Sequence, residues 1–307
     1  MVATNVHIGA AFLVQVATGT LGNLFLLSQY LFHYFSGCRS RATDLILRHL
    51  TVANLLVILS RGIPETMAAF GFEDFLSDLG CKLVFYVHRV GRGVSMSSTC
   101  LLSVFQATTI SPRSSKWTEL NVEAKKYTSI STVLCWLLHM LLNVTFPATV
   151  TAKWRNKNVT SKLDFAYCSG PGYEKVLYSI TTALFSISDT LCMGLMICTS
   201  SSMVSTLYKH KKQVQHIYKL NVGSRSSPVT RATDGILVLV CTYVHFYTIS
   251  CIIQVYLAVF QHPSTLLLTT AALINTCFPT LCPFVLMSHD HSLSKIFRFY
   301  CRRNTVI

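Results

Sequence analysis

The sequence predicts an all-α membrane protein, a bundle of seven transmembrane helices, and its composition and hydropathy carry this prediction. The chain has 307 residues, of which 51% are hydrophobic and only 12% are charged. A soluble domain has about 25% charged residues. The mean hydropathy is +0.47, and the apolar residues gather in runs long enough for the about 20 residues that one helical crossing needs. Such crossings use most of the chain, so we expect a single membrane domain over residues 1–307.

Short polar segments separate the apolar runs and set the expected helix boundaries. We expect helices at about residues 8–32, 45–63, 81–110, 127–149, 176–207, 235–260 and 265–287. No charged segment precedes the first run, which indicates a retained signal anchor rather than a cleaved signal peptide. In the tail, residues 288–307, apolar side chains such as Leu293, Ile296 and Tyr300 recur at helical spacing, which predicts a short amphipathic helix at the membrane surface.

The basic residues orient the bundle. A net charge of +14 in a soluble protein would favour a nucleic-acid partner, but here the basic residues lie in short stretches between apolar runs, so we expect no nucleic acid. Sixteen Lys and Arg fall in the odd-numbered loops and the tail, and seven fall on the other side. The positive-inside rule therefore predicts an outside N-terminus and a cytoplasmic C-terminus. A multi-pass protein of the plasma membrane is expected.

Two features of the loops agree with this orientation. Asn158 begins a glycosylation sequon in the long loop before the fifth helix, on the side assigned to the outside; an unused sequon is the alternative. Asn143 begins a second sequon, but at membrane depth, where we expect no glycan. Cys81 and Cys168 both lie on the outer side, and that oxidising compartment allows a disulfide between them.

The remaining cysteines and acids predict no metal site, no cofactor and no enzymatic activity. Most of the other cysteines lie within apolar runs and are interpreted as small hydrophobic residues. No CxxC pair or Cys/His spacing indicates a metal. Asp189 alone supplies no catalytic constellation of acids at membrane depth. Cys301 follows the basic amphipathic segment and is a palmitoylation candidate, with a plain free thiol as the equal alternative.

Polar and proline residues at membrane depth mark a structural core, because polar groups there are costly and face the bundle interior. Asn23, Asn54, Trp136 and Pro283 stand out, and their spacing resembles the marker positions of rhodopsin-like G-protein-coupled receptors. Gln106 stands where that superfamily has the arginine of its DRY motif. Asn54 replaces its usual aspartate, and CPFVL replaces NPxxY around Pro283.

These departures match one branch of the superfamily. The matching segments are LILRHLTVAN (45–54), SRGIP (60–64), TCLLSVFQA (99–107), HKKQVQHI (210–217), SPVTRAT (227–233) and CFPTLCPFVLMS (277–288). They resemble vomeronasal type 1 receptors, from the first helix through the tail. The resemblance implies a pheromone or odorant receptor that binds a small-molecule ligand and activates an inhibitory-type (Gi/Go) G protein.

Polar side chains in the outer turns of the helices are the candidates for a ligand site. We expect ligand-binding roles for His88, Arg89, Arg92, Asp189, Tyr247 and Asn275. His88 and Arg92 lie four residues apart, on one helix face, where they suit an anionic or carbonyl-bearing ligand. The alternatives are snorkelling to the headgroups or pairing with acids, and Asp189 is an attractive partner for Arg92.

Gln106, Lys211 and Lys212 are expected to face the G protein from the cytoplasmic side, where the positive-inside rule alone also explains the two lysines. Anionic membrane lipids are the other expected partner of this basic stretch. Two alternatives to a signalling receptor remain open. One is a degenerate receptor that no longer signals; the other, with less support, is a small-solute transporter or channel, although no internal repeat is visible.

Overall fold

The computed structural model describes residues 2–36, 42–72, 75–110, 116–152, 167–169, 175–217, 228–259 and 265–289. The long helices are α1 (Val2–Phe35), α2 (Ala42–Val57), α4 (Asp78–Ile110), α5 (Lys116–Asn143), α6 (Lys175–Ile217), α7 (Pro228–Val259) and α8 (Thr265–His289). The shorter elements are the π-helical turn η1 (Ile58–Gly62), α3 (Ile63–Ala69), the 3₁₀ turn η2 (Phe146–Thr149), β1 (Thr151–Ala152) and β2 (Cys168–Ser169).

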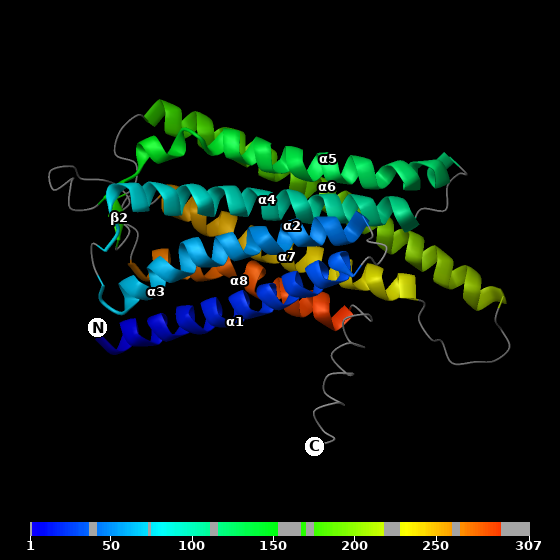
Figure 1. The fold of residues 1–307 in the computed structure, drawn as a ribbon, viewed down its shortest axis with the longest axis horizontal. Coiled ribbons are helices and arrows are strands. Elements are labelled where there is room, and N and C mark those ends of the chain that lie inside the picture. Colours follow the sequence, from blue (N-terminus) through cyan, green and yellow to red (C-terminus); the bar gives the residue numbers. More distant parts are fainter. Residues whose placement is uncertain are drawn as a thin grey trace, which may run out of the picture.

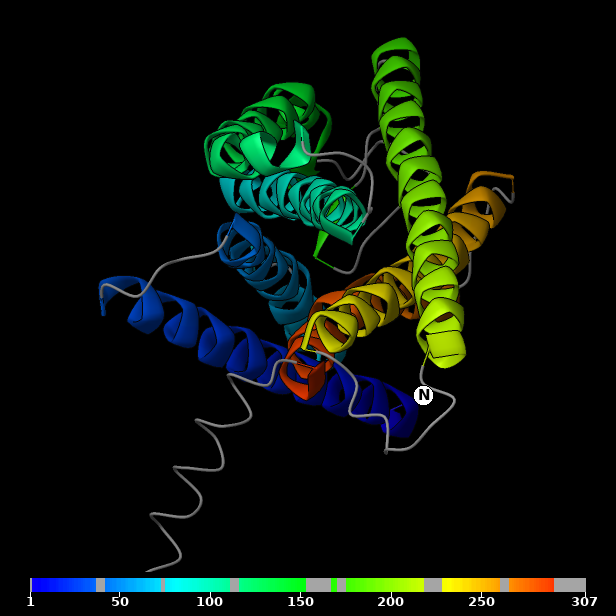
Figure 2. The same cartoon turned by 90° about the vertical axis from the view of Figure 1, so that its right-hand side faces the viewer.

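The long helices run alongside one another, and α4 lies at the centre of the bundle (Figure 1). Helix α4 contacts α2, α5, α6 and α7, whereas α1 packs against α2, α3 and α8 (Figure 2). The N-terminus of α1, the helix α3 and strand β2 all lie at the same end of the bundle (Figure 1). The position of α4 explains why it buries polar side chains such as Ser95, Ser97 and Ser103, because those groups then find partners on neighbouring helices.

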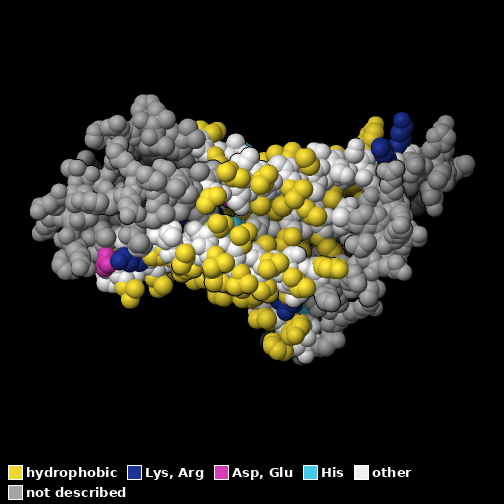
Figure 3. Space-filling view, turned by 90° about the horizontal axis from the view of Figure 1, so that it is seen from above, with side chains coloured by type: hydrophobic (Ala, Val, Ile, Leu, Met, Phe, Trp, Pro, Cys, Tyr) yellow, Lys and Arg dark blue, Asp and Glu magenta, His cyan; other side chains and the backbone are white. Residues whose placement is uncertain are grey.

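The outer surface of the bundle is apolar. Within the described residues, five helical segments are long and apolar enough to cross a membrane: Val6–Phe35, Ala42–Ala69, Ile187–Lys209, Thr233–Ile253 and Leu267–Ser288. A space-filling view shows hydrophobic side chains gathered over the middle of one face, with the described lysines and arginines mostly toward its ends (Figure 3). Leu21, Leu134 and Leu191 are among the large apolar side chains that remain exposed. Such a belt suits contact with lipid.

The helices extend beyond the hydrophobic runs that predicted them. Helix α5 begins at Lys116 rather than near residue 127, and α6 continues to Ile217 rather than ending near residue 207. Hydropathy marks the part of a helix that lies in lipid, whereas the hydrogen-bonded backbone continues into polar turns outside it. The amphipathic helix expected in the tail, together with Cys301, lies outside the described residues.

The second predicted helix is broken where hydropathy shows one run. Helix α2 passes through η1 into α3, and Pro64 lies in the first turn of α3. Proline has no amide hydrogen, and its ring crowds the carbonyl of the residue four positions earlier, here Ser60. The wider π-helical turn accommodates this local loss of hydrogen bonding. Arg61 lies in this turn and is buried.

The prolines of α8 explain how Asn23 joins α1 to α8. Pro279 and Pro283 lie inside α8. Because Pro283 has no amide hydrogen, the carbonyl of Pro279 lacks its usual helical donor. The Asn23 Nδ2 donates to that carbonyl at 2.9 Å and to the Gly19 carbonyl at 2.7 Å. Pro283 also lies so close to Gly22 that a Cβ there would come within 2.9 Å of its ring.

The other two marker residues also connect helices. Ser95 of α4 donates its hydroxyl to Oδ1 of Asn54 in α2 at 2.8 Å. Trp136 of α5 donates its indole N–H to Nδ1 of His49 in α2 at 3.1 Å. Each bond gives a polar group in the bundle a partner on the neighbouring helix, which removes part of the cost of burying it.

Candidate functional site

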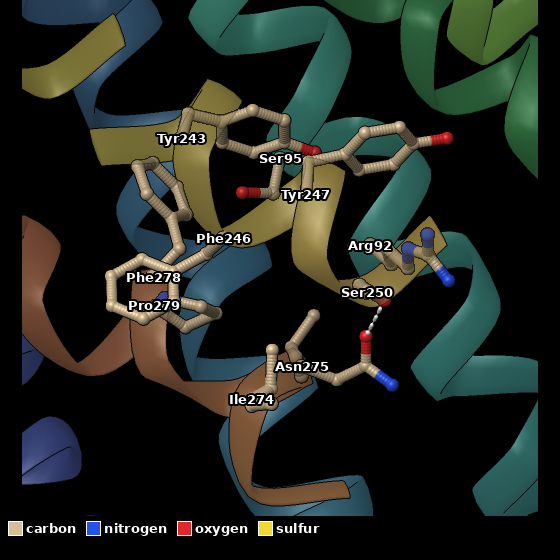
Figure 4. Close-up of a pocket in the computed structure, with 11 residues that line it drawn as sticks. Arg92, Ser95, Tyr243, Phe246, Tyr247, Ser250, Ile274, Asn275, Phe278 and Pro279 are labelled. Atoms are coloured by element: carbon tan, nitrogen blue, oxygen red, sulfur yellow. Dashed lines mark hydrogen bonds between the residues drawn. The ribbon is translucent and has the colours of Figure 1, made fainter. Parts of the chain in front are cut away.

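A cavity lies between α4, α7 and α8, and Val57 of α2 also belongs to its lining (Figure 4). Its lining comprises Val57, Arg92, Ser95, Tyr243, Phe246, Tyr247, Ser250, Ile274, Asn275, Phe278 and Pro279. Three of the residues that the sequence predicted for the ligand site therefore line one cavity: Arg92, Tyr247 and Asn275. Arg92 is eleven residues after Cys81 in α4, or about 16 Å along the helix axis. The cavity is thus near the middle of α4, and Arg92 is slightly nearer to the disulfide-bearing end.

Arg92 and Asp189 are connected through Tyr247. The Arg92 guanidinium carbon lies 5.2 Å from the centre of the Tyr247 ring. The Tyr247 hydroxyl donates to Oδ2 of Asp189 at 2.5 Å. Among the described residues, the ion pairs are Arg61–Glu65 and Lys82–Asp78, so Arg92 and Asp189 do not form the direct pair that the sequence left open. The tyrosine separates the two charges and leaves Arg92 on the cavity wall.

Asn275 is held by a bond across the wall of the cavity. The Ser250 hydroxyl of α7 donates to Oδ1 of Asn275 in α8 at 2.5 Å. Figure 4 shows the amide oxygen directed at Ser250 and the amide nitrogen directed away from it. Ser95 lines the cavity from α4 with a hydroxyl that already donates to Asn54. The polar groups of the cavity are therefore fixed by neighbours on three helices.

His88 and Arg89 occupy different places in the bundle. His88 is buried one helical turn from Arg92, on the same face of α4, and its Nδ1 has no hydrogen-bond partner among the described residues. It is not part of the cavity lining. Arg89 faces α5, where its Nε donates to Oδ1 of Asn143 at 2.9 Å and its guanidinium lies 4.1 Å from the Phe146 ring centre. Those contacts favour a structural role for Arg89 over its expected ligand role.

Residues 167–169, which precede α6, are attached to the end of the bundle where α4 begins. A disulfide joins Cys81 of α4 to Cys168 of β2, as the sequence predicts, and β2 pairs antiparallel with β1. The neighbouring Tyr167 is 1% exposed and packs against Phe85 and Phe75. Its hydroxyl donates to Oε1 of Glu65 at 3.3 Å. Burial raises the pKa of the Tyr167 phenol, so the group stays protonated and remains a donor.

Glu65 of α3 is itself held in place by an ion pair with Arg61 of η1. Its Oε1 lies 2.9 Å from Nη2 of Arg61, one turn earlier. Arg61 also lies 5.9 Å from the ring centre of Phe85. The loop is thus attached to the bundle by the disulfide and by the hydrogen bond from Tyr167 to a paired carboxylate.

At the opposite end of α4, the candidate G-protein residues differ in their surroundings. The Gln106 amide donates to Oγ1 of Thr233 in α7 at 3.2 Å, and Gln106 is buried. Lys212 is exposed near the end of α6. Lys211 lies in the same helix, but its side chain is outside the described part of the chain, as is the whole of Asn158.

Sequence reasoning missed the aromatic and hydroxyl residues that complete the cavity. Tyr243 and Phe278 meet edge to face, with ring centres 4.5 Å apart, and Ser250 fixes Asn275. A signal for part of this set exists: Tyr243, Tyr247 and Ser250 are spaced at i, i+4 and i+7, which places them on one helix face. Phe278 carries no comparable signal, because an aromatic residue in an apolar helix is ordinary.

The chain is similar to known proteins over nearly its whole length. The model of the vomeronasal organ pheromone receptor family matches residues 6–299. The chain is 54% identical to human vomeronasal type-1 receptor 2 over 292 residues, which is 95% of this chain and 74% of that protein. It is 49% identical to human vomeronasal type-1 receptor 3 over 305 residues, which is 99% of this chain and 97% of that protein. An olfactory receptor class A-like protein from Danio rerio is 28% identical over 286 residues, 93% of this chain and 90% of that protein.

Proposed function

Because the chain belongs to the vomeronasal organ pheromone receptor family, we propose that it is a chemosensory G-protein-coupled receptor of the plasma membrane. It binds a small pheromone or odorant ligand in the half of the bundle nearer the disulfide and activates a Gi/Go-type G protein. The observation that carries this proposal is the cavity between α4, α7 and α8, with the Arg92 guanidinium on its wall. The family consists of receptors, so no enzymatic activity is assigned.

The chemistry of the cavity supports ligand binding. An ionised side chain at membrane depth is costly and faces a cavity, a partner or a functional site. Arg92 meets an aromatic face at Tyr247 and a space lined by polar and aromatic groups from three helices. A ligand that binds one arrangement of these helices more tightly shifts the population toward that arrangement. Motion of α7 relative to α4 then changes the cytoplasmic end, where Gln106 contacts Thr233.

In the proposed topology, one domain over residues 1–307 crosses the membrane seven times. Helices α4 and α5 have 33 and 28 residues, or about 50 and 42 Å at the rise of an α-helix. Both exceed the roughly 30 Å thickness of the hydrocarbon core, so they span it together with the five apolar segments. The end that carries the Cys81–Cys168 disulfide lies outside, because disulfides persist in oxidising compartments. The C-terminus is then cytoplasmic.

The cytoplasmic surface in this topology contains the end of α6. That helix continues to Ile217 and carries Lys211 and Lys212 beyond its apolar part. A protruding basic helix suits contact with the G protein and with anionic lipid headgroups. Gln106 replaces the arginine usual at this place, so its hydrogen bond to Thr233 of α7 joins two uncharged groups.

The ligand site is tested by surface expression followed by a screen of volatile and steroid compounds with a Gi/Go readout. We expect responses in the wild type. Replacing His88 and Arg92 together by alanine should abolish them at unchanged surface level, and Arg92→Ala alone should weaken the response about 10- to 150-fold. A hydrogen bond to a charged group contributes about 1.5–3 kcal/mol, which corresponds to this range.

The controls separate binding from folding. Arg89→Ala should lower surface level through loss of the Asn143 contact while leaving ligand potency per receptor unchanged. Val133→Ala, on the exposed face of α5, should change neither quantity. Silence across a broad panel at good surface levels would favour a degenerate receptor, and ligand-dependent current without a G protein would favour a channel or transporter. Unchanged potency in the His88/Arg92 variant would remove both from the site.

The orientation is tested by glycosylation. Asn158→Gln should abolish a glycosidase-sensitive shift in mobility, because Asn158 lies in the loop assigned to the outside. Asn143→Gln should leave the shift intact, since the Asn143 side chain is fully buried between Arg89 and the His139 carbonyl. A glycan that survives in the Asn158 variant and disappears in the Asn143 variant would reverse this expectation.

A further inference from the structure

The strongest hydrogen-bond acceptors around the cavity are already engaged within the protein. Oδ1 of Asn275 accepts a hydrogen bond from Ser250. Asp189 lies behind Tyr247 rather than on the cavity lining, and its Oδ2 accepts the tyrosine hydroxyl. A ligand that enters the cavity therefore meets an amide oxygen that already accepts one hydrogen bond, and the carboxylate is not on the cavity wall.

The strong donors remain available. Asn275 has a second polar atom, Nδ2, which donates to no other group in the described part of the chain and is directed away from Ser250 (Figure 4). Arg92 contributes several N–H donors and no acceptor. Its described contact is with the aromatic face of Tyr247, which leaves guanidinium hydrogens for a ligand. The two donor groups come from α4 and α8 and lie on the wall of the same cavity.

The rest of the wall is apolar and aromatic. Tyr243 and Tyr247 lie stacked with ring centres 6.0 Å apart, and Tyr243 meets Phe278 edge to face. Phe246 and Ile274 add further apolar surface. A small apolar body suits this wall, and burial of its surface supplies the non-directional part of the affinity.

We propose that the cavity selects its ligands by hydrogen-bond polarity. It binds small molecules that have an apolar body and one polar group, and that group is a hydrogen-bond acceptor such as a carbonyl or a carboxylate. It rejects amines. This inference rests on the proposed function and names the ligand class of the same site. An ammonium group there meets the Arg92 charge and the Asn275 N–H, and each of these donors would lose its solvent without gaining a bond.

The test uses three probes that share one aromatic skeleton: acetophenone, phenylacetate and 1-phenylethylamine. Binding is measured on the full-length receptor in lipid nanodiscs as the shift in unfolding midpoint with ligand concentration. We expect acetophenone and phenylacetate to bind at least tenfold more tightly than the amine. Equal or tighter binding of the amine overturns the proposal, as does the absence of any shift with both acceptor probes up to their solubility limits.

Two variants locate the preference in the named residues. Asn275→Asp replaces the N–H donor by an acceptor, so it should weaken acetophenone binding about tenfold and strengthen binding of the amine. Arg92→Gln should weaken phenylacetate more than acetophenone, because it removes the charge but keeps an N–H donor. Val133→Ala, on the exposed face of α5, should keep the wild-type order. An unchanged order in both cavity variants overturns the assignment.

Binding and signalling are read separately, so the two proposals fail in different ways. Acceptor-selective binding without any Gi/Go response contradicts the proposed signalling function and supports the ligand class. A Gi/Go response that amines and carbonyl compounds elicit equally supports the receptor function and overturns the ligand class.

Discussion

Replacing Cys168 by serine is expected to remove most of the receptor from the cell surface and to lower its unfolding midpoint in detergent. The disulfide joins residues separated by 87 positions. Loss of a disulfide that closes a loop of this size costs about 2–5 kcal/mol. Because folded proteins have a total stability of only about 5–15 kcal/mol, this single bond is a large share. Surface immunostaining and thermal unfolding measure the two effects.

The disulfide also holds the neighbouring residue Tyr167 in place. Tyr167, next to Cys168, packs with Phe85 and Phe75 at the disulfide-bearing end of the bundle. The Tyr167 hydrogen bond to Glu65 of α3 and this packing are weaker, non-covalent contacts of the same segment. Tyr167→Phe keeps the disulfide and the ring but loses the hydroxyl, so its cost should be that of one hydrogen bond to a charged group, about 1.5–3 kcal/mol.

The matched control is a free cysteine on the outer surface of the bundle. Cys241→Ala should leave surface level and unfolding midpoint unchanged, because Cys241 is exposed in α7 and is not in a disulfide. A reducing agent applied to the wild type in detergent should reproduce the Cys168→Ser midpoint and should not change the variant. Wild-type surface levels for both the Cys81→Ser and Cys168→Ser variants would contradict the stabilising role of the bond.

Hydropathy predicted the helices well and their ends poorly, for a physical reason. The apolar run reports only the segment that lipid requires to be apolar, so the expected start of the fourth helix near residue 127 missed the polar turns from Lys116. The break at η1 was also absent from the hydropathy pattern. Pro64 is its local signal, yet a proline permits a kink, a π-helical turn or a helix end, and packing decides among these.

The sequence predicted only part of the candidate site. Residue type and spacing identify which side chains share one face of a helix, but not which helix packs against that face. His88 and Arg92 share a face by their spacing of four. Arg89 was placed with them, although the packing of α5 provides it with Asn143 and Phe146 instead. The sequence alone does not specify which side of α4 receives α5. The position of Tyr247 between Arg92 and Asp189 depends likewise on how α7 packs beside α4 and α6.

Gly93→Ala is expected to destabilise the bundle more than its single added methyl group suggests. A Cβ at this position would lie 2.2 Å from Nδ1 of His139 and 2.6 Å from Cε1. The imidazole has little room to move, since His139 is 1% exposed and its Nε2 is hydrogen-bonded to the Ser97 hydroxyl at 2.8 Å. Relief of this clash therefore requires α4 to move away from α5. Overpacking of this kind lowers the free energy of unfolding by about 1–3 kcal/mol or more.

A double-variant cycle identifies the clash as the cause. His139→Ala removes the imidazole, leaves a cavity and deletes the hydrogen bond to the Ser97 hydroxyl, so it destabilises the protein on its own. On that background Gly93→Ala should add almost nothing, because the methyl group then enters vacant space and the two costs are not additive. Gly194→Ala in α6 is the control, since no atom lies within 4 Å of its added Cβ. It should be neutral or stabilising by up to about 1 kcal/mol, as alanine restricts the unfolded chain. Unfolding midpoints in detergent measure all four variants, and a Gly93→Ala protein as stable as Gly194→Ala would show that α4 and α5 are not in close contact here.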